Sequence, residues 1–236
     1  MDPVERIGTP RAGALVFTCE HASNRVPPPW RRSRADAALL LDHWGWDIGA
    51  AAVTRHLVAR LGGAGVLSRY SRLLCDVNRA PDDPTLVLQR CDNAVVSFNR
   101  RYDRAERVAR FHTPFHAAVD AAMAAARPRF LVSIHSFTPV FRGHVRPMDA
   151  GVLYDAHDAA AARLVDAMRV EGFACAHNEP YSGKDGLIYS PARHGVRHDV
   201  PYLELELRQD RVGTPARAVA EAERVARALV AAGIAG

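Results

Sequence analysis

The fold is decided by the stretch Val132-Ser133-Ile134-His135-Ser136-Phe137-Thr138. This stretch is a short apolar run that stops at a histidine followed by a hydroxyl side chain. Such a run is typical of a buried strand in a parallel-type sheet that reaches its carboxyl end. In open α/β sheets, ligands and catalytic groups gather at that end. His135 is therefore well placed to bind a metal, although a lone histidine there is more often an ordinary buried, hydrogen-bonded residue.

The regions on both sides of this stretch alternate between strand and helix patterns. Strands are predicted at residues 14–19, 73–75, 129–134, 151–154 and 201–207. Helices are predicted at residues 48–61, 101–126, 158–170 and 214–232. This alternation predicts a single α/β domain over residues 1–236, with helices around a mixed, mostly parallel sheet. Its core is expected to span about 14–210, and a C-terminal helix within 214–234 closes it.

The composition argues against several protein classes. The 236 residues are 48% hydrophobic and 24% charged, as in ordinary globular proteins. No run of about 18 apolar residues is present, so no membrane helix is expected. Residues 1–6 carry acidic side chains without an apolar stretch, which argues against a signal peptide. The four cysteines lie far apart and form no CxxC pair, which favours reduced thiols and a cytoplasmic location.

The net charge of +5 raises the question of nucleic-acid binding. The 31 Lys and Arg residues are, however, scattered among 26 Asp and Glu residues. The densest basic cluster, within residues 100–110, is interleaved with Asp103 and Glu106 at helical spacing, which indicates a solvated helix face. No nucleic-acid partner is therefore expected, and the oligomeric state is not encoded in any pattern of this sequence.

Five segments at predicted strand ends carry polar chemistry. They are residues 20–24, 46–47, 76–79, 135–136 and 204–208. Because strand ends of one sheet converge in space, these segments are able to build one site. Two histidines and a carboxylate make up a known ligand set for catalytic zinc. A further carboxylate can relay protons, and an arginine matches an anionic substrate.

The same segments resemble the N-formylglutamate amidohydrolase family, whose members are similar in fold to zinc carboxypeptidases. Cys19-Glu20-His21-Ala22-Ser23-Asn24-Arg25-Val26-Pro27 is similar to the opening motif of that family, and so is the segment Tyr70–Arg79. Ser133-Ile134-His135-Ser136-Phe137 resembles the carboxypeptidase segment with the last zinc histidine, and Leu205-Glu206-Leu207-Arg208 the one with the catalytic glutamate. The order of the motifs along the chain also agrees with the family.

The resemblance implies one Zn²⁺ ion, or another divalent metal, held by His21, Asp47 and His135. This sequence departs from the carboxypeptidase pattern at the second ligand. Carboxypeptidases have His-x-x-Glu, whereas here Asn24 stands three residues after His21, where the glutamate would be. A neutral amide is a poor zinc ligand, so Asp47 is favoured, in a segment similar to one of the deformylase branch. Asn24, Glu20 and Asp42 remain alternatives, and Asp47 is also placed to be a helix N-cap.

The resemblance also implies roles for other residues. Glu206 is the favoured general acid/base; Glu204 faces the same side of the strand, and an ion pair of Glu206 with Arg208 is the alternative. Asn78 and Arg79 are assigned to the substrate carboxylate, although they also fit a surface turn. Arg72 either polarises the acyl oxygen or supports the site.

Predictions also concern two residues near the pocket and two histidines near residue 196. His116 and Arg146 lie in segments similar to the family and are assigned to the substrate pocket, with helix packing as the alternative for His116. His194 and His198 are expected to face solvent.

The predicted function is that of a metal-dependent hydrolase acting on a linear amide. Its substrate is a small N-acyl amino acid, with N-formylglutamate as the model. Alternatives are a peptidase or deacylase acting on another small carboxylate-bearing amide, and a metal-binding or ligand-binding module without catalysis. The presence of Glu206 argues against the last alternative, because pure binding needs no proton shuttle.

Overall fold

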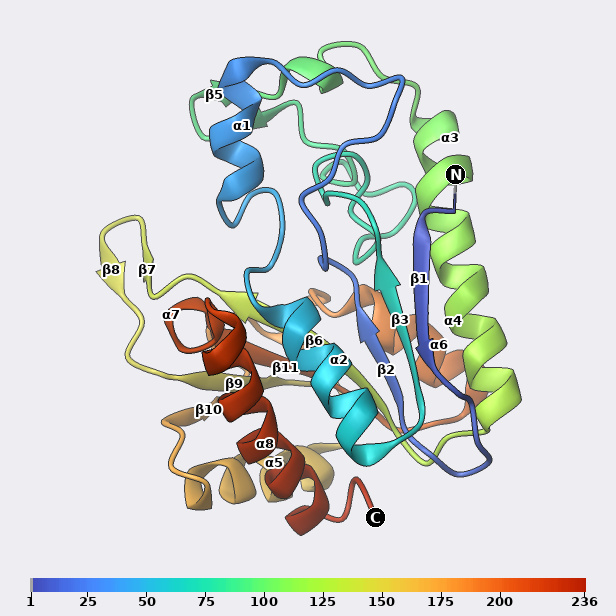
Figure 1. The fold of residues 1–236 in the computed structure, drawn as a ribbon, viewed down its shortest axis with the longest axis vertical. Helices are drawn as coiled ribbons and strands as arrows, with labels where there is room; N and C mark the ends of the chain where they lie inside the picture. Colours follow the sequence, from blue (N-terminus) through green and yellow to red (C-terminus); the bar gives the residue numbers. More distant parts are fainter. Residues whose placement is uncertain (1) are drawn as a thin grey trace.

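The computed structural model describes residues 2–236, and its centre is a mixed sheet of seven strands (Figure 1). In spatial order the strands are β1 (Val4–Gly8), β3 (Ala64–Ser68), β2 (Val16–Cys19), β6 (Leu131–Phe137), β11 (Tyr202–Arg208), β9 (Ala150–Leu153) and β10 (Cys175–His177). The central strands from β3 to β11 are parallel. The edge strand β1 and the pair β9–β10 run antiparallel to them. The predicted α/β domain with a mixed, mostly parallel sheet is confirmed.

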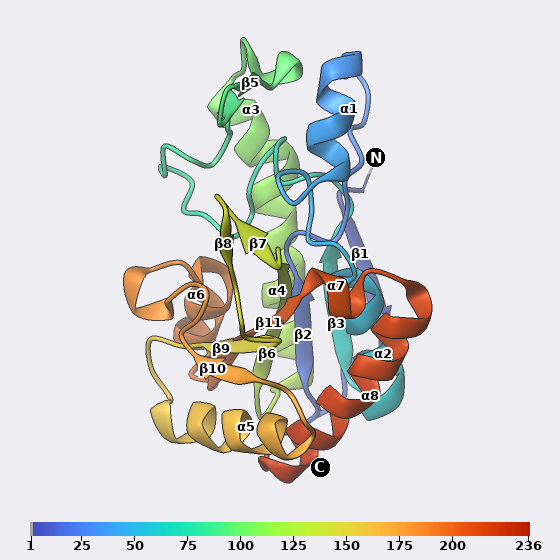
Figure 2. The same cartoon turned by 90° about the vertical axis from the view of Figure 1, so that its left-hand side faces the viewer.

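Helices cover both faces of the sheet, as Figures 1 and 2 show from two directions. On one face lie α2 (Ala50–Leu61), α5 (Asp158–Val170) and α8 (Pro215–Ala231), which share one apolar core with the strands. On the other face, α4 (Thr113–Ala126) and α6 (Tyr189–His198) lie over a second core. Four of these helices (α2, α4, α5 and α8) bury mainly apolar side chains, and α6 packs beside α4, so the domain has three layers.

The alternation of side chains along β6 and β11 explains where polar groups gather. Five apolar side chains of the two strands lie in the core beneath α2 and α8: Val132, Ile134, Leu203, Leu205 and Leu207. Successive side chains of a strand point to opposite faces, so Ser133, His135, Glu204 and Glu206 share the other face. The parallel register pairs Glu204 with Ser133 and Glu206 with His135. The four polar side chains therefore lie side by side near the carboxyl ends of the two strands.

The other elements surround this framework. They are α1 (Arg34–Leu41), α3 (Arg104–Arg107), α7 (Gln209–Val212), a π-helical turn (Val108–His112), 3₁₀ turns at Ser97–Asn99 and Gly183–Asp185, and the hairpins β4 (Arg90–Cys91) with β5 (Ala94–Val95) and β7 (Val140–Phe141) with β8 (His144–Val145). Within residues 2–236, none of the helices combines the length and apolar character needed to cross a bilayer.

Two predicted elements need correction. The segment 73–75, predicted as a strand, lies in a turn region. Its two leucines are buried in a third core together with Leu40 and Phe98, which explains the apolar residues at these positions. The predicted helix 101–126 begins at Arg104 and passes through the π-helical turn before Pro114. Proline lacks an N–H and crowds the preceding turn, and a wider π turn accommodates it without ending the helix.

Candidate functional site

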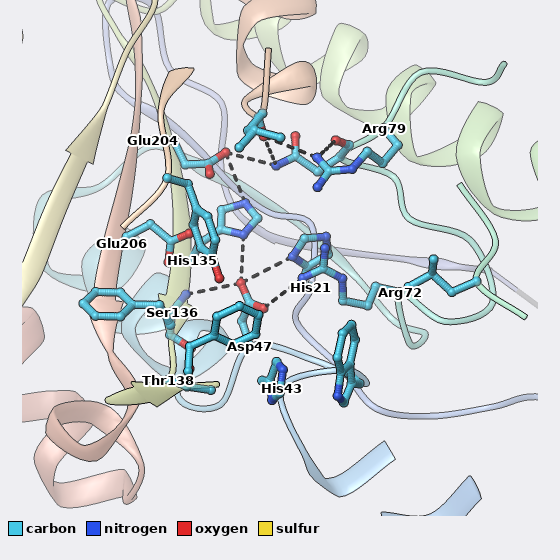
Figure 3. A pocket seen from close by; sticks show the side chains of 17 residues that line it. His21, His43, Asp47, Arg72, Arg79, His135, Ser136, Thr138, Glu204 and Glu206 are labelled. Carbon is cyan, nitrogen blue, oxygen red and sulfur yellow. Dashed lines mark hydrogen bonds and ion pairs between the residues drawn. The ribbon is translucent and has the colours of Figure 1, made fainter. Parts of the chain in front are cut away.

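A pocket lies where the carboxyl ends of β6 and β11 meet the loop after β2 (Figure 3). Its ionisable and amide side chains are His21, His43, Asp47, Arg72, Asn78, Arg79, His135, Glu204 and Glu206. Its apolar and aromatic side chains are Trp44, Leu88, Phe137, Phe141, Tyr181 and Leu187. The structure thus brings together most of the residues that the sequence assigns to a site, whereas His116 and Arg146 lie outside the lining.

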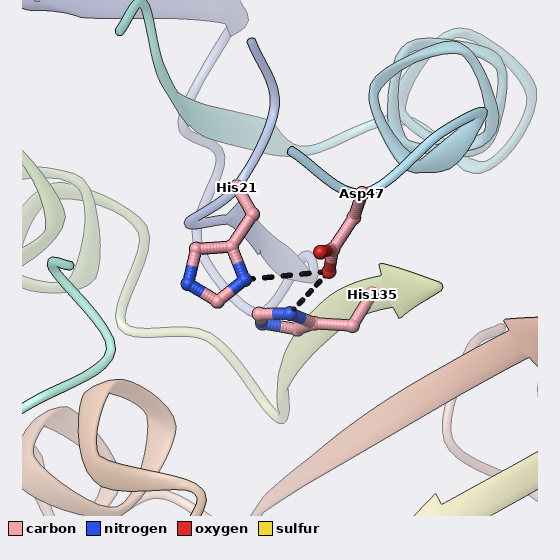
Figure 4. A group of neighbouring side chains, drawn as sticks. All are labelled: His21, Asp47 and His135. Carbon is pink, nitrogen blue, oxygen red and sulfur yellow. Dashed lines mark hydrogen bonds and ion pairs between the residues drawn. The ribbon is translucent and has the colours of Figure 1, made fainter. Parts of the chain in front are cut away.

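Three buried side chains from different segments converge in this pocket: His21, Asp47 and His135 (Figure 4). The Nδ1 atom of His135 lies 2.8 Å from Oδ2 of Asp47, and the Nδ1 atom of His21 lies 3.3 Å from the same oxygen. The two imidazole rings meet edge-on, with centroids 4.7 Å apart. Two imidazole nitrogens and a carboxylate oxygen facing one point form a donor set able to hold a divalent transition metal.

The backbone holds Asp47 between a loop and a strand. Its N–H donates to the carbonyl of His21 over 2.9 Å, and its Oδ2 accepts a hydrogen bond of 3.2 Å from the N–H of Ser136. Gly49 has φ of 87°, and a Cβ on it would lie 2.3 Å from the carbonyl oxygen of Val212. Glycine is therefore required there, because it lets the chain turn into α2 directly after Asp47.

The outer nitrogens of both histidines, the Nε2 atoms that point away from Asp47, contact carboxylates. Nε2 of His21 lies 2.7 Å from Oδ1 of Asp76, and Nε2 of His135 lies 3.1 Å from Oε2 of Glu20. A carboxylate only accepts, so each ring donates from Nε2, and a metal ion beside Asp47 would take the lone pair of each Nδ1. This arrangement orients metal-binding histidines in many proteins. These two positioning roles are not predicted from the sequence, although Glu20 and Asp76 both belong to the family-like motifs.

Unlike Asp47, none of the three alternative ligands lies where the two histidines converge. Asp42 is exposed at the end of α1, and Asn24 is not among the pocket residues. Glu20 contacts the outer nitrogen of a histidine and not the point of convergence. The interpretation of Asp47 as the N-cap of α2 is wrong, because Gly49 is the N-cap residue and no side chain caps that helix.

Glu204 and Glu206 point from β11 toward His135, and their carboxylates lie within 4.8 Å of the ring nitrogen. Oε2 of Glu204 accepts a hydrogen bond of 3.1 Å from Nδ2 of Asn78. Oε2 of Glu206 is buried without a hydrogen-bond partner among the described residues. Burial raises the pKa of Glu206 to about 8, and the negative charges of Asp47 and Glu204 add to the shift. Glu206 is thus the carboxyl group best suited to exchange a proton near neutral pH.

The alternative role of Glu206, an ion pair with Arg208, is wrong. The guanidinium of Arg208 lies 3.0 Å from Asp149 and 2.8 Å from Asp210. It therefore points away from the pocket to a different pair of carboxylates.

Two arginines face the pocket, and they differ in how firmly they are held. Nε and Nη2 of Arg72 donate to Oδ2 of Asp76 over 3.1 and 2.6 Å, and its Nη1 lies 3.7 Å from Oδ1 of Asp47. Burial lowers the pKa of Arg72, but the charges of Asp76 and Asp47 outweigh it and raise the pKa above its usual value. Within the described chain, the side-chain hydrogen bonds of Arg79 run from Nη1 to two carbonyl oxygens. Its other nitrogens are available to an anion.

The amide of Asn78 is already engaged within the protein. Nδ2 donates to Glu204, and Oδ1 accepts a hydrogen bond of 2.8 Å from the N–H of Ser190 at the start of α6. Asn78 therefore joins the loop before Arg79 to both β11 and α6.

Arg146 and His116 support the surroundings of the pocket. The Arg146 guanidinium lies 4.9 Å from the ring centre of Phe141 and 5.1 Å from that of Tyr181, and it donates to the Tyr181 hydroxyl. His116 is buried in α4, and its Nε2 donates over 3.1 Å to the carbonyl of Val77. Arg146 thus stiffens an aromatic wall, and His116 supports the loop that carries the next residue, Asn78.

The expectation that His194 and His198 face solvent is wrong for His194, which is completely buried, and His198 is half-buried. The polar pattern of α6 predicts exposure, but this part of the helix packs against α4.

Comparisons with solved structures show the same fold. The gene product Atu2144 from Agrobacterium tumefaciens is similar to this chain with a TM-score of 0.87 and 28% identity, over 98% of this chain and 96% of the other. An N-formylglutamate amidohydrolase from Ralstonia eutropha JMP134 has a TM-score of 0.73 and 18% identity, over 100% and 98%. A metallo-carboxypeptidase from Burkholderia cenocepacia has a TM-score of 0.50 and 14% identity, over 98% of this chain and 60% of the other.

Among curated protein sequences, none matches this chain. The sequence model of N-formylglutamate amidohydrolases, in contrast, matches residues 13–212, which include every residue of the polar pocket. The resemblance that the sequence motifs indicate is therefore confirmed, and the chain belongs to the N-formylglutamate amidohydrolase family.

Proposed function

We propose that the protein is a zinc-dependent amidohydrolase that cleaves the N-acyl amide of a small carboxylate-bearing amino acid, with N-formylglutamate as the model substrate. One observation carries this function: His21, His135 and Asp47 converge beside the unpartnered Oε2 of Glu206. The family supports an amide as the bond that is cleaved.

The three converging side chains fit a catalytic zinc ion better than a structural one. Structural zinc sites are closed by four protein ligands, whereas catalytic sites use three and keep one position open. His21 and His135 each donate the outer N–H to a carboxylate, as zinc-binding histidines commonly do. When bound, zinc polarises a carbonyl oxygen and lowers the pKa of a water molecule to about 7.

Glu206 is the proposed proton shuttle. Its Oε2 accepts a proton from the attacking water and later delivers it to the nitrogen of the leaving amine. Glu206 in β11 is paired with His135 in β6, so its carboxylate lies next to the converging ligands. A raised pKa suits both steps, because the group has to gain and lose a proton at similar pH.

The arginines are proposed to bind the anionic parts of substrate and transition state. Arg79 has free nitrogens to pair with the substrate carboxylate, and the planar guanidinium favours a two-point contact. Arg72 is fixed by Asp76, so its Nη1 is preorganised to stabilise the developing negative charge on the acyl oxygen. Asn78 is assigned a positioning role for Glu204 and the loop.

A second candidate is a deacylase for a larger, more apolar N-acyl amino acid. It is favoured by the aromatic side chains of Trp44, Phe137, Phe141 and Tyr181 in the pocket lining. Such rings bury apolar groups well, whereas a formyl group and the chain of glutamate offer little apolar surface.

Hydrolysis of a panel of N-acyl amino acids tests the proposed function. Formyl, acetyl and phenylacetyl derivatives of glutamate and phenylalanine are compared, before and after removal of metal with a chelator. Zinc-loaded protein is expected to release the free amino acid, to lose turnover on chelation and to regain it with Zn²⁺. Preference for phenylacetyl substrates would select the second candidate. Zinc-loaded protein that hydrolyses none of the compounds would contradict both.

Arg79→Gln is expected to raise KM for a carboxylate substrate by roughly 10–100-fold. This factor corresponds to the free energy that is lost with one hydrogen bond to a charged group. The same variant should bind a substrate whose carboxylate is replaced by a carboxamide about as well as the unaltered protein does. Arg142→Gln, in the exposed β7–β8 turn, is the matched control and should leave KM unchanged. An equal rise of KM for both substrates would show that Arg79 does not contact the carboxylate.

A further inference from the structure

A second cluster of metal-ligating side chains lies between α4 and α6, two helices that pack side by side (Figures 1 and 2). Asp120 belongs to α4, and His194 and His198 belong to α6. The two histidines are four residues apart, so they lie on one face of the helix. None of the three residues lines the pocket. Their ligand atoms all lie within 4.8 Å of one another.

The three side chains converge as closely as those in the pocket. Nδ1 of His194 lies 3.0 Å and Nε2 of His198 lies 2.9 Å from the same atom, Oδ1 of Asp120. Two imidazole nitrogens thus meet one carboxylate oxygen, which is also the arrangement around Asp47.

Hydrogen bonding to His116 fixes which atoms of His194 carry protons. Nε2 of His116 lies 3.1 Å from the carbonyl of Val77, which only accepts, so a neutral His116 carries its proton there. Its Nδ1 is then an acceptor for Nε2 of His194 at 2.8 Å. A neutral His194 therefore donates from Nε2 and turns the lone pair of Nδ1 toward Asp120. Two lone pairs 3.0 Å apart require a cation between them, either a second proton on His194 or a metal ion.

We propose that Asp120, His194 and His198 form a second divalent-metal site, suited to Zn²⁺, that ties α6 to α4. Two imidazoles and one carboxylate are a zinc ligand set, and such nitrogen donors select against Mg²⁺ and Ca²⁺. His194 is 0% exposed, whereas the side chains of His198 and Asp120 are 20% and 26% exposed. The open side gives the ion access and leaves room for water ligands. The outer N–H of His194 has His116 as its acceptor, which orients the ring.

Arg197 competes with the metal in this arrangement. Its Nε lies 3.3 Å from Oδ1 of Asp120, and its side chain is 62% exposed. An exposed arginine side chain can rotate into solvent when a divalent ion takes its place. Arg197→Gln is therefore expected to bind zinc several-fold more tightly at this site.

The site has a structural consequence for the pocket. Ser190 at the start of α6 donates to Asn78, and His116 links His194 to the carbonyl of Val77. A metal that holds α6 against α4 therefore stiffens the loop with Asn78 and Arg79. Zinc at this position is expected to raise the melting temperature and to contribute nothing to the chemical step.

Zinc binding to the full chain, counted by elemental analysis after equilibrium dialysis, tests this site. The unaltered protein is expected to bind two equivalents, and His198→Gln and Asp120→Asn one each. His144→Gln, an exposed histidine on β8, is the matched control and should bind two. His198→Gln should retain its hydrolytic activity but lose part of the rise in melting temperature that zinc produces.

Failure of the second site is distinguishable from failure of the proposed function. If only the site between α4 and α6 binds zinc, the unaltered protein and His135→Ala bind one equivalent, and His198→Gln binds none. If His198→Gln and Asp120→Asn bind as much zinc as the unaltered protein, with the same rise in melting temperature, the second site is refuted. A proton, and not a metal ion, then lies between Nδ1 of His194 and Asp120.

Discussion

Replacing Glu206 by glutamine is expected to lower kcat by about 10²–10⁴-fold, the usual contribution of a positioned general acid/base. Glutamine preserves the size of the side chain but cannot accept a proton from water. Zinc content and KM should change little, because Glu206 is not one of the three converging ligands. Steady-state kinetics together with elemental analysis of the same preparation check this result.

Glu204→Gln is the matched control for this experiment. Glu204 lies two residues away on the same face of β11, and a glutamine there still accepts the hydrogen bond from Asn78. Its loss in kcat should be much smaller than that of Glu206→Gln. A larger loss in Glu204→Gln, with near-normal turnover in Glu206→Gln, would reverse the assignment of the proton shuttle.

Replacing Asp47 by asparagine is expected to weaken zinc binding and to lower kcat/KM on the order of 10³-fold, because metal catalysis supplies several kcal/mol to the transition state. The amide oxygen is a much poorer ligand than the carboxylate that both histidines face. Metal analysis after dialysis against a weak chelator, combined with the panel assay, measures both effects.

Asp42→Asn provides the control, since Asp42 was an alternative ligand and is exposed at the end of α1. It should retain its zinc and full activity. Loss of zinc in Asp42→Asn but not in Asp47→Asn would move the third ligand to the other aspartate. The thermal unfolding of both variants should be compared, so that a loss of metal is not mistaken for a loss of fold.

The sequence predicts the centre of the fold well because its strands are buried and their patterns are local. The apolar run at 14–19 contains β2, and the alternating segment 201–207 coincides with β11 within one residue. The position of β9, antiparallel to β11 and parallel to β10, depends on contacts between distant segments and has no local signal. The leucines at 73–75 misled the prediction for the same reason, because they pack in a core formed by distant residues.

For the candidate site, the motifs predict which side chains meet but not how each is held. His21, Asp47 and His135 do converge, but only His21 and His135 lie at strand ends, because Asp47 lies in the loop between α1 and α2. The contacts of Glu20 and Asp76 with the outer histidine nitrogens depend on side-chain geometry that spacing does not encode. The amphipathic pattern of α6 likewise does not reveal that His194 is buried against α4.

The most direct test of the central claim is a crystal of the zinc-loaded protein measured on both sides of the zinc absorption edge. We expect an anomalous peak bonded to Nδ1 of His21, Nδ1 of His135 and an oxygen of Asp47, at about 2.0–2.2 Å from each. A peak held instead by His135, Glu204 and Glu206, the other donor group in the pocket, would contradict it. So would the absence of any peak in the pocket of an active enzyme.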